Sequence, residues 1–147
     1  MPEPIEIKLE NQAVEEKLLD LAKRGENLRP LMKNIAGVFA YSTEENFENE
    51  GRPKWTGLKE VTKKARTKIK KWPGKILQVE GMLASSLSTQ YDENSAIIGS
   101  NLPYAAIHQK GGKAGRNKKV EIPARPYLKL SDDDFEEILD VTEKFLQ

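Results

Sequence analysis

The sequence predicts a single α+β domain in which helices at both ends of the chain flank a small, mostly antiparallel sheet. Three observations lead to this fold class. Apolar residues recur at helical spacing before residue 50 and after residue 131, and two short apolar runs are separated by an Asp/Asn-rich turn. The 147 residues are 37% hydrophobic, enough for a core that buries roughly two-thirds of the unfolded surface. We expect a helical part at 1–50, an α+β core at 51–131 and a C-terminal helix at 132–147.

Two helices are predicted in the first fifty residues, and together they form a helical hairpin. The first ends at Gly25, which suits the left-handed conformation that closes a helix. The second begins near Pro30, whose missing N–H has no helical partner to lose, and ends at Gly51 and Pro53. Gly37 interrupts the second pattern and costs ~1 kcal/mol relative to alanine unless another backbone packs closely there. The apolar positions are Leu9, Val14, Leu18, Leu21 and Ala22, then Leu31, Ile35, Val38, Phe39 and Phe47.

A third, partly irregular helix is predicted in the basic stretch at 51–74. A narrow buried stripe would run along it, formed by Trp55, Leu58, Val61, Ala65 and Ile69. After the turn at Pro73 and Gly74, apolar residues at 76–87 predict a short helix that gives way to a strand at 85–91. The polar turn at 92–94 and the apolar run at 95–99 complete an antiparallel hairpin.

The last third of the chain combines a glycine-rich loop, an extended segment and a helix. Residues 110–119 hold three glycines and five Lys/Arg, which predicts an exposed, mobile loop. Val120 and Ile122 resume an extended pattern, and Pro123 and Pro126 keep the following residues out of a helix. Ser131 is a good N-cap for a final helix, whose acidic first turn at 132–134 complements the positive helix end.

The charges are segregated along the chain even though the net charge is only +1. Residues 1–50 carry 6 Lys/Arg and 11 Asp/Glu, residues 51–119 carry 15 and 4, and residues 120–147 carry 3 and 8, which gives −5, +11 and −5. Such segregation is typical of a surface that meets an oppositely charged partner or phosphates, although solvated helix faces are the plain alternative. The candidate interface residues are Lys63, Lys64, Arg66, Lys68, Lys70, Lys71, Lys113, Arg116, Lys118, Lys119 and Arg125.

The residue types exclude several kinds of chemistry. The chain has no cysteine, so thiolate metal sites, disulfides and cysteine nucleophiles are absent. His108 is the only histidine, and neither Ser95 nor Ser100 lies in a nucleophile-elbow glycine pattern. We therefore expect no enzyme, metal or cofactor, and we interpret His108 as structural, with a hydrolase built on it as the remote alternative. No stretch approaches the ~18–20 apolar residues of a membrane span and no secretory signal begins the chain, so we expect a protein used inside the cell.

A set of local patterns between Trp55 and Ser131 resembles the phage virion morphogenesis family, which includes tail-completion proteins and the Mu-like virion morphogenesis protein. The most specific part is YAAIHQ at 104–109, followed by two glycines and then by IPARPYL at 122–128. The residues that carry the resemblance are Trp55, Leu58, Gly81, Leu83, Gly99, Tyr104, Ala105, His108, Gln109, Gly111, Gly112, Pro123, Arg125, Pro126 and Tyr127.

The resemblance implies a non-enzymatic assembly protein that acts at the end of a phage tail or at its junction with the head. It would work in the bacterial cytoplasm and take its place in the tail or neck. Its partners would be tail or neck proteins and further copies of itself. Head-to-tail contacts between surfaces of unlike charge would arrange these copies as a ring. The alternative is a nucleic-acid-binding accessory protein that uses the basic segments at 59–75 and 110–119.

Within the motif, the residues also predict specific contacts. Tyr104 and Tyr127 are expected to pack with Ile98, Ile107 and Leu128. His108 and Gln109 can satisfy backbone groups at the turn before the glycines. Arg125, between two prolines on an extended segment, is expected to form an ion pair with Glu121, with a helix carboxylate or with a second subunit.

Overall fold

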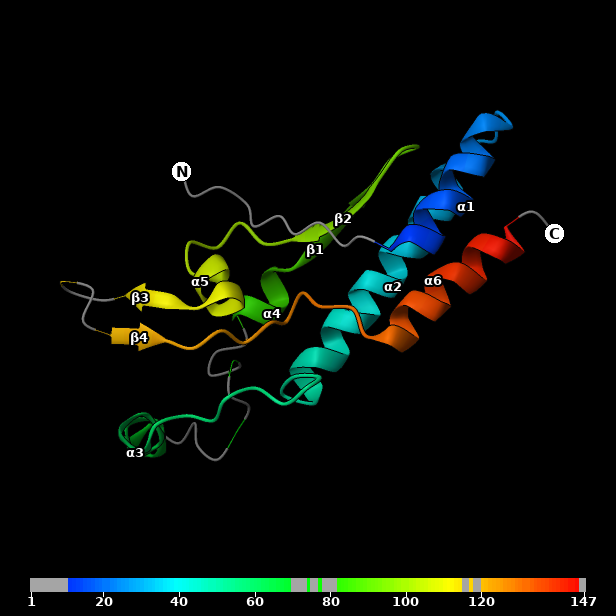
Figure 1. The fold of residues 1–147 in the computed structure, drawn as a ribbon. Coiled ribbons are helices and arrows are strands. Elements are labelled where there is room, and N and C mark those ends of the chain that lie inside the picture. Colours follow the sequence, from blue (N-terminus) through cyan, green and yellow to red (C-terminus); the bar gives the residue numbers. More distant parts are fainter. Residues whose placement is uncertain are drawn as a thin grey trace.

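The computed structural model describes residues 11–69, 82–114 and 120–145, together with Gly74, Leu77 and Asn117. Figure 1 shows the long helices lying along one another on one side of the molecule, and the hairpins with short helices on the other. The elements follow the order α1 (Gln12–Lys23), α2 (Arg29–Glu48), α3 (Glu60–Lys68), α4 (Met82–Ser86), β1 (Ser88–Tyr91), β2 (Ala96–Gly99), α5 (Ala105–Lys110), β3 (Gly112–Ala114), β4 (Val120–Ile122) and α6 (Asp132–Lys144). The α+β fold with a C-terminal helix is confirmed.

The helical side is held together by one apolar cluster. The C-terminal helix α6 packs against both α1 and α2 (Figure 1). The predicted helix end at Gly25 is present, with φ +75°. At the other end of α1, Asn11 accepts a hydrogen bond from the Val14 N–H at 3.1 Å. Burial of apolar side chains is the main force that joins these helices. The cluster consists of Leu21, Leu28, Leu31, Met32, Ile35, Leu130 and Ile138.

Gly51 closes the connection after α2 in a conformation that few other residues adopt. Its φ is +101°, and a Cβ placed on it would lie 2.5 Å from the carbonyl oxygen of Pro53 and 2.5 Å from a ring carbon of Trp55. We therefore expect Gly51→Ala to lower the free energy of unfolding by about 1–3 kcal/mol. Urea unfolding measures this change, with Gly57→Ala as the control, because a Cβ on Gly57 meets nothing within 4 Å. Equal stability of the two variants would contradict the assignment.

Gly37 lies in α2, where a glycine has no packing role within the monomer. A Cβ placed on it meets nothing within 4 Å. Since glycine costs up to ~1 kcal/mol relative to alanine inside a helix, Gly37→Ala should raise the melting temperature by about 2–4 °C. A melting curve followed by circular dichroism measures this. An unchanged or lower melting temperature of monomeric protein would show that the glycine serves the fold of the single chain.

The first hairpin confirms the predicted strand pair. Strands β1 and β2 are antiparallel, from Ser88 opposite Gly99 to Tyr91 opposite Ala96. The Asp92 carboxylate accepts the N–H groups of Asn94 at 2.7 Å and Ser95 at 2.8 Å, which fixes the turn. Both strands lie against α2, so this hairpin joins the helical side of the molecule to the rest (Figure 1).

The glycine-rich segment is partly ordered, which corrects the expectation of a mobile loop at 110–119. Gly111, at φ +75°, ends α5, and β3 then pairs antiparallel with β4, from Gly112 opposite Ile122 to Ala114 opposite Val120. The extended residues at 120–122 supply the partner strand, which composition alone did not show. Residues 115, 116, 118 and 119 lie outside the described part.

The extended segment at 123–131 joins neither hairpin in the described structure, so the antiparallel pairing is divided between two separate two-stranded sheets. Pro123 and Pro126 have no N–H to give to a ladder. The N–H groups of Tyr127 and Leu128 donate instead to the side chain of Gln109. The segment is thus fixed by side chains rather than by a neighbouring strand.

Helix α3 is present, but the predicted buried stripe along it is wrong. Val61 is 80% exposed and Ile69 is 58% exposed, and no residue of α3 is buried. Trp55 alone reaches the core, at 8% exposure, because it precedes the helix and lies on the connection from α2. In Figure 1, α3 lies at the end of the molecule away from α1. Its apolar residues therefore face outward.

Candidate functional site

Gln109, at the end of α5, is the residue that clamps the extended segment. Its side-chain oxygen accepts the N–H of Tyr127 at 3.0 Å and of Leu128 at 2.8 Å, and its nitrogen donates to the Leu128 carbonyl at 3.1 Å. The side chain is 8% exposed, so these three bonds satisfy buried backbone groups that no strand satisfies. The sequence prediction that Gln109 satisfies backbone groups is confirmed, but the groups belong to the PYL residues rather than to the glycine turn.

Tyr127 is the centre of the second apolar cluster and is fully buried. Its ring stacks on Phe47 with centroids 5.4 Å apart, and Phe47 meets Trp55 edge-on at 5.9 Å. The Tyr127 hydroxyl donates to the Ala105 carbonyl, and burial raises the pKa of this phenol well above its ordinary value. Trp55 donates from Nε1 to the Pro126 carbonyl at 3.1 Å. The motif residues of three segments therefore meet in one packed unit.

Arg125 forms no ion pair with a carboxylate in the described structure, which corrects the prediction of a partner within the chain, while the predicted pair with a second subunit stays a prediction. The guanidinium donates to the carbonyl oxygens of Thr56 at 2.9 Å and Gly57 at 3.2 Å. The backbone N–H of Arg125 donates to the His108 carbonyl at 2.8 Å. Arg125 is 6% exposed, and its burial together with the nearby charge of Arg66 lowers its pKa. Arg125 thus ties the start of the basic segment to α5, and a buried guanidinium has little surface left for a partner.

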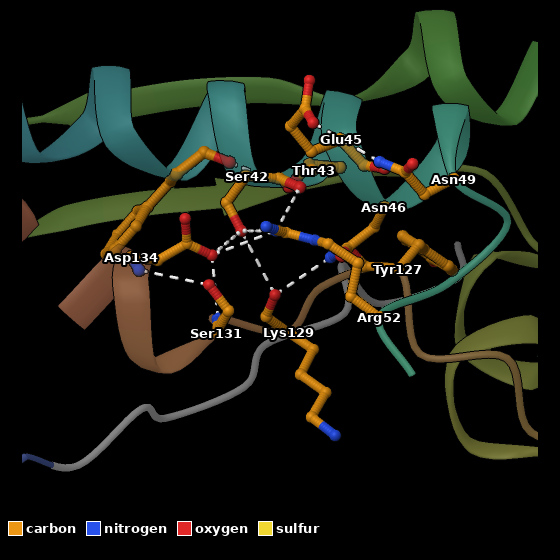
Figure 2. A network of polar contacts seen from close by, with 11 residues as sticks. Ser42, Thr43, Glu45, Asn46, Asn49, Arg52, Tyr127, Lys129, Ser131 and Asp134 are labelled. Atoms are coloured by element: carbon orange, nitrogen blue, oxygen red, sulfur yellow. Dashed lines mark hydrogen bonds and ion pairs between the residues drawn. The ribbon is translucent and has the colours of Figure 1, made fainter. Parts of the chain in front are cut away.

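A polar network joins α2, α6 and the end of the extended segment (Figure 2). Arg52 donates to the Asp134 carboxylate at 3.0 Å and, through Nε, to the Asn46 side-chain oxygen at 2.8 Å. Ser42 donates to Asp134 at 2.7 Å. Asn46 donates in turn to the carbonyls of Tyr127 at 2.7 Å and Lys129 at 2.9 Å. We call Ser42, Asn46, Arg52, Ser131 and Asp134 the Arg52 network.

Asp134 occupies the centre of this network and also caps α6. Its carboxylate accepts the Ser131 N–H at 2.8 Å, while Ser131 accepts the Asp134 N–H at 3.1 Å. Burial by itself raises the pKa of Asp134, but the hydrogen bonds from Ser42 and Ser131 and the charge of Arg52 outweigh it, so the pKa lies below its ordinary value. The predicted N-cap at Ser131 is confirmed, and it forms one corner of a larger structure.

Sequence reasoning missed the rest of the Arg52 network and also Phe47 as the partner of Tyr127. One signal was present: Ser42 and Asn46 lie four residues apart, so they share one face of α2. Both are buried, at 1% exposure each. Polar residues on a buried helix face need partners, but apart from Arg52, which lies 6 to 10 positions away, those partners come from 81 to 92 positions further along the chain. No spacing in the sequence announces such a pairing.

His108 and Tyr104 lie at the edge of this unit. Tyr104 is 37% exposed and meets His108 edge-on at 5.9 Å, so of the two tyrosines predicted to pack with Ile98 and Leu128, Tyr127 lies in that cluster and Tyr104 does not. The Nδ1 atom of His108 is buried without a hydrogen-bond partner in the described structure. Burial, with the charges of Arg125 and Arg66, lowers the pKa of His108 below its ordinary 6.5. Among the described residues, Nδ1 therefore has no carboxylate partner of the kind that orients the histidine of a catalytic triad.

The lowered pKa of His108 predicts a loss of stability in mild acid. The unfolded chain takes up a proton near pH 6.5, whereas the folded chain takes it up only at a lower pH. The stabilising contribution is therefore complete above about pH 6.5 and is lost as the pH falls from there toward the folded pKa. The melting temperature measured against pH should fall in this range, and His108→Gln should remove that part of the fall. Identical profiles for both proteins would contradict the assignment.

The candidate interface residues are divided between two settings. Lys64 and Lys68 of α3 and Lys113 of β3 are exposed. Lys63 is partly buried and pairs with Glu60 at 3.3 Å, and Arg66 faces inward, where its charge acts on Arg125 and His108. Lys70, Lys71, Arg116, Lys118, Lys119 and the motif residue Gly81 lie outside the described residues.

The remaining motif residues are structural in position. Leu83 and Ala105 are buried in the cluster around Tyr127, and Gly99 ends β2. Gly111 lies where a Cβ would be 2.8 Å from the Ala124 nitrogen, so only glycine allows this approach to the extended segment. In the described ranges, no group of three or more His, Asp or Glu residues could hold a metal ion. Among the same residues, no helix is long and apolar enough to cross a membrane.

The geometry defines a class of protein, a structural scaffold. The side chains of its sequence motif fix one extended segment, at 123–131, through internal contacts. A separate helix, α3, has its charged and apolar side chains exposed. The phage virion morphogenesis family model matches residues 9–147, and the chain belongs to that family. Its members serve phage morphogenesis, a structural role.

Individual relatives agree with this assignment. The chain is 41% identical to Mu-like prophage FluMu G protein 2 of Haemophilus influenzae, over 97% of this chain and 96% of the relative. It is 36% identical to FluMu G protein 1 of the same organism, over 91% and 89%. It is 35% identical to the putative capsid assembly protein G of Escherichia phage Mu, over 79% and 78%. No solved structure matches the chain.

Proposed function

We propose that this protein is a non-enzymatic component of a bacteriophage or prophage that completes the tail or joins it to the head through protein–protein contacts. It acts in the host cytoplasm during assembly and becomes part of the tail or neck. The observation that carries the proposal is that different parts of the chain supply the internal contacts and the exposed surface. The motif residues around Tyr127 make internal contacts, whereas α3 places cationic and apolar side chains on the surface, as an assembly interface requires.

The tail or neck is favoured by the motif itself, because YAAIHQ and IPARPYL together resemble the tail-completion proteins of this family. The Mu relative is described as a putative capsid assembly protein, so head assembly is the step that the experiment must separate from tail completion. Both steps are structural, and both need surfaces that bind other virion proteins.

The test is deletion of the gene from an inducible phage or prophage, followed by electron microscopy of the lysate. Tail completion or head–tail joining predicts DNA-filled heads together with separate tails, which are unattached or of abnormal length. A plasmid copy of the gene should restore complete particles. Absence of filled heads, with normal tails, would overturn the proposal in favour of head assembly.

Nucleic-acid binding remains the second candidate because Lys64 and Lys68 are exposed on one helix of the basic segment. It predicts salt-dependent binding to duplexes of arbitrary sequence, lost when both lysines are changed to glutamate. Fluorescence anisotropy at low salt measures this, and absence of binding there would dispose of the candidate. The exposed Val61 and Ile69 on the same helix favour a protein partner, because phosphates offer nothing apolar.

A further inference from the structure

A groove runs along the outer face of α2 and α6, with a volume of about 790 Å³. Gly37, Val38, Tyr41 and Val141 give it an apolar surface, and Tyr41 is 61% exposed. Glu45, Asp133 and Glu137 line it with negative charge, opposed by Lys33 alone apart from the Arg52–Asp134 pair. The groove therefore suits an apolar, positively charged occupant.

The glycine in this groove gives independent information on the shape of the occupant. Gly37 faces open space within the monomer, although alanine would suit the helix better. A glycine on a helix surface allows the backbone of a second helix to come close. The feature that is unexplained in the single chain is thus accounted for if a helix packs across α2 at Gly37.

Helix α3 has the complementary surface. Val61, Ala65 and Ile69 are spaced by four residues and form an exposed apolar stripe, which Lys64 and Lys68 flank. The partly buried residues of the helix, Thr62, Lys63 and Arg66, lie on its inner side, and the helical period of 3.6 residues places Lys64 and Lys68 opposite them. The outward face is therefore basic at its centre, with the apolar stripe along one side.

We propose that α3 of one copy docks in the α2–α6 groove of a second copy. A helix of nine residues is about 14 Å long, and the groove runs from Lys33 to Glu45 along α2, about 18 Å. The outward lysines of α3 meet Glu45, Asp133 and Glu137, and its valine and isoleucine meet Val38, Tyr41 and Val141. Helix α3 lies away from α6 of its own chain (Figure 1), so the contact joins two different surfaces of two copies. Repetition of this contact from copy to copy gives a ring or a filament.

The inference rests on the proposed assembly role and names its self-contact, so the test uses purified full-length protein and not particles. One variant, Lys64→Glu/Lys68→Glu, reverses the charge of the docking face of α3. A second variant, Gly37→Leu/Glu137→Lys, blocks the groove and changes its charge. Light scattering after size exclusion should show wild-type assemblies larger than two chains, which shrink when salt rises from about 0.1 to 0.5 M. Each variant alone should be a monomer. Their mixture should form a complex of two chains, since one intact α3 and one intact groove remain.

The matched control is Lys17→Glu/Lys110→Glu, which makes the same charge change at exposed positions of α1 and α5 and should assemble like the wild type. Circular dichroism confirms that each variant is folded. Persistent assembly of either interface variant, or a mixture that stays monomeric, would overturn the inference. A wild-type protein that is monomeric at the highest concentration reached would also overturn the inference. The occupant of the groove would then be another virion protein. Neither result bears on the deletion experiment, so the two proposals fail separately.

Discussion

Replacing Tyr127 with alanine is expected to lower the free energy of unfolding by about 3–5 kcal/mol, the range for removing a fully buried aromatic side chain. The residue is fully buried, stacks on Phe47 and donates to the Ala105 carbonyl. A domain of this size is stable by only about 5–15 kcal/mol, so the variant should lose a large part of its total stability. Urea unfolding followed by tryptophan fluorescence measures the loss, since Trp55 lies in the same cluster.

The control for this prediction is Tyr127→Phe. It keeps the ring on Phe47 and removes the donor to Ala105, so it should cost only about 1–3 kcal/mol. The difference between the two variants separates packing from hydrogen bonding. A loss below about 1 kcal/mol for the alanine variant would contradict the central place given to Tyr127.

Arg52→Ala is the second large effect, with an expected loss of about 2–3 kcal/mol. Removing one partner of a buried ion pair costs about 3–5 kcal/mol, and the lower figure follows because the Arg52 side chain is 26% exposed while that of Asp134 is 8% exposed. Asp134 keeps the hydrogen bonds from Ser42 and Ser131 but loses its countercharge. Urea unfolding near neutral pH measures the change. Arg24→Ala is the control, because the pair of Arg24 with Asp20 is exposed and should cost less than about 1 kcal/mol.

The Arg52 network also predicts how the effect of Arg52→Ala on stability changes with pH. The pKa of Asp134 is lowered in the folded chain, so its stabilising contribution is complete above the unfolded value of about 3.9 and is lost as the pH falls through the folded pKa. Loss of Arg52 brings the folded pKa nearer to the unfolded one. The difference in stability between wild type and Arg52→Ala should therefore shrink in acid. A difference that stays constant down to about pH 2 would contradict the charge-based explanation.

The sequence predicts the parts of the fold that depend on neighbouring residues. The end of α1 at Gly25, the start of α2 at Pro30, the turn at Asp92 and the Ser131 cap each follow from residues within a few positions of one another. It fails where partners are distant. The pattern predicts a buried stripe on α3, but the period alone does not say which face meets a core. The composition of β3 predicts a loop, because only its partner strand decides its conformation.

The candidate site divides in the same way. Gln109, Arg125 and Tyr127 were identified by resemblance, and their roles follow from backbone groups that the prolines and the absence of a neighbouring strand leave to side chains. The Arg52 network had no local signature beyond Ser42 and Asn46. Assembly roles for Lys64 and Lys68 stay predictions, whereas the inward position of Arg66 and the burial of Arg125 point to roles in the fold.

The central claim is that the motif builds the scaffold while α3 makes the contacts of assembly. Its most direct test is the titre of infectious particles from a phage whose gene carries Lys64→Glu/Lys68→Glu, measured beside the Lys17→Glu/Lys110→Glu control and the deletion. The account predicts a folded, normally abundant protein and a titre as low as that of the deletion, with the control at the wild-type titre. A wild-type titre from the α3 variant would contradict it.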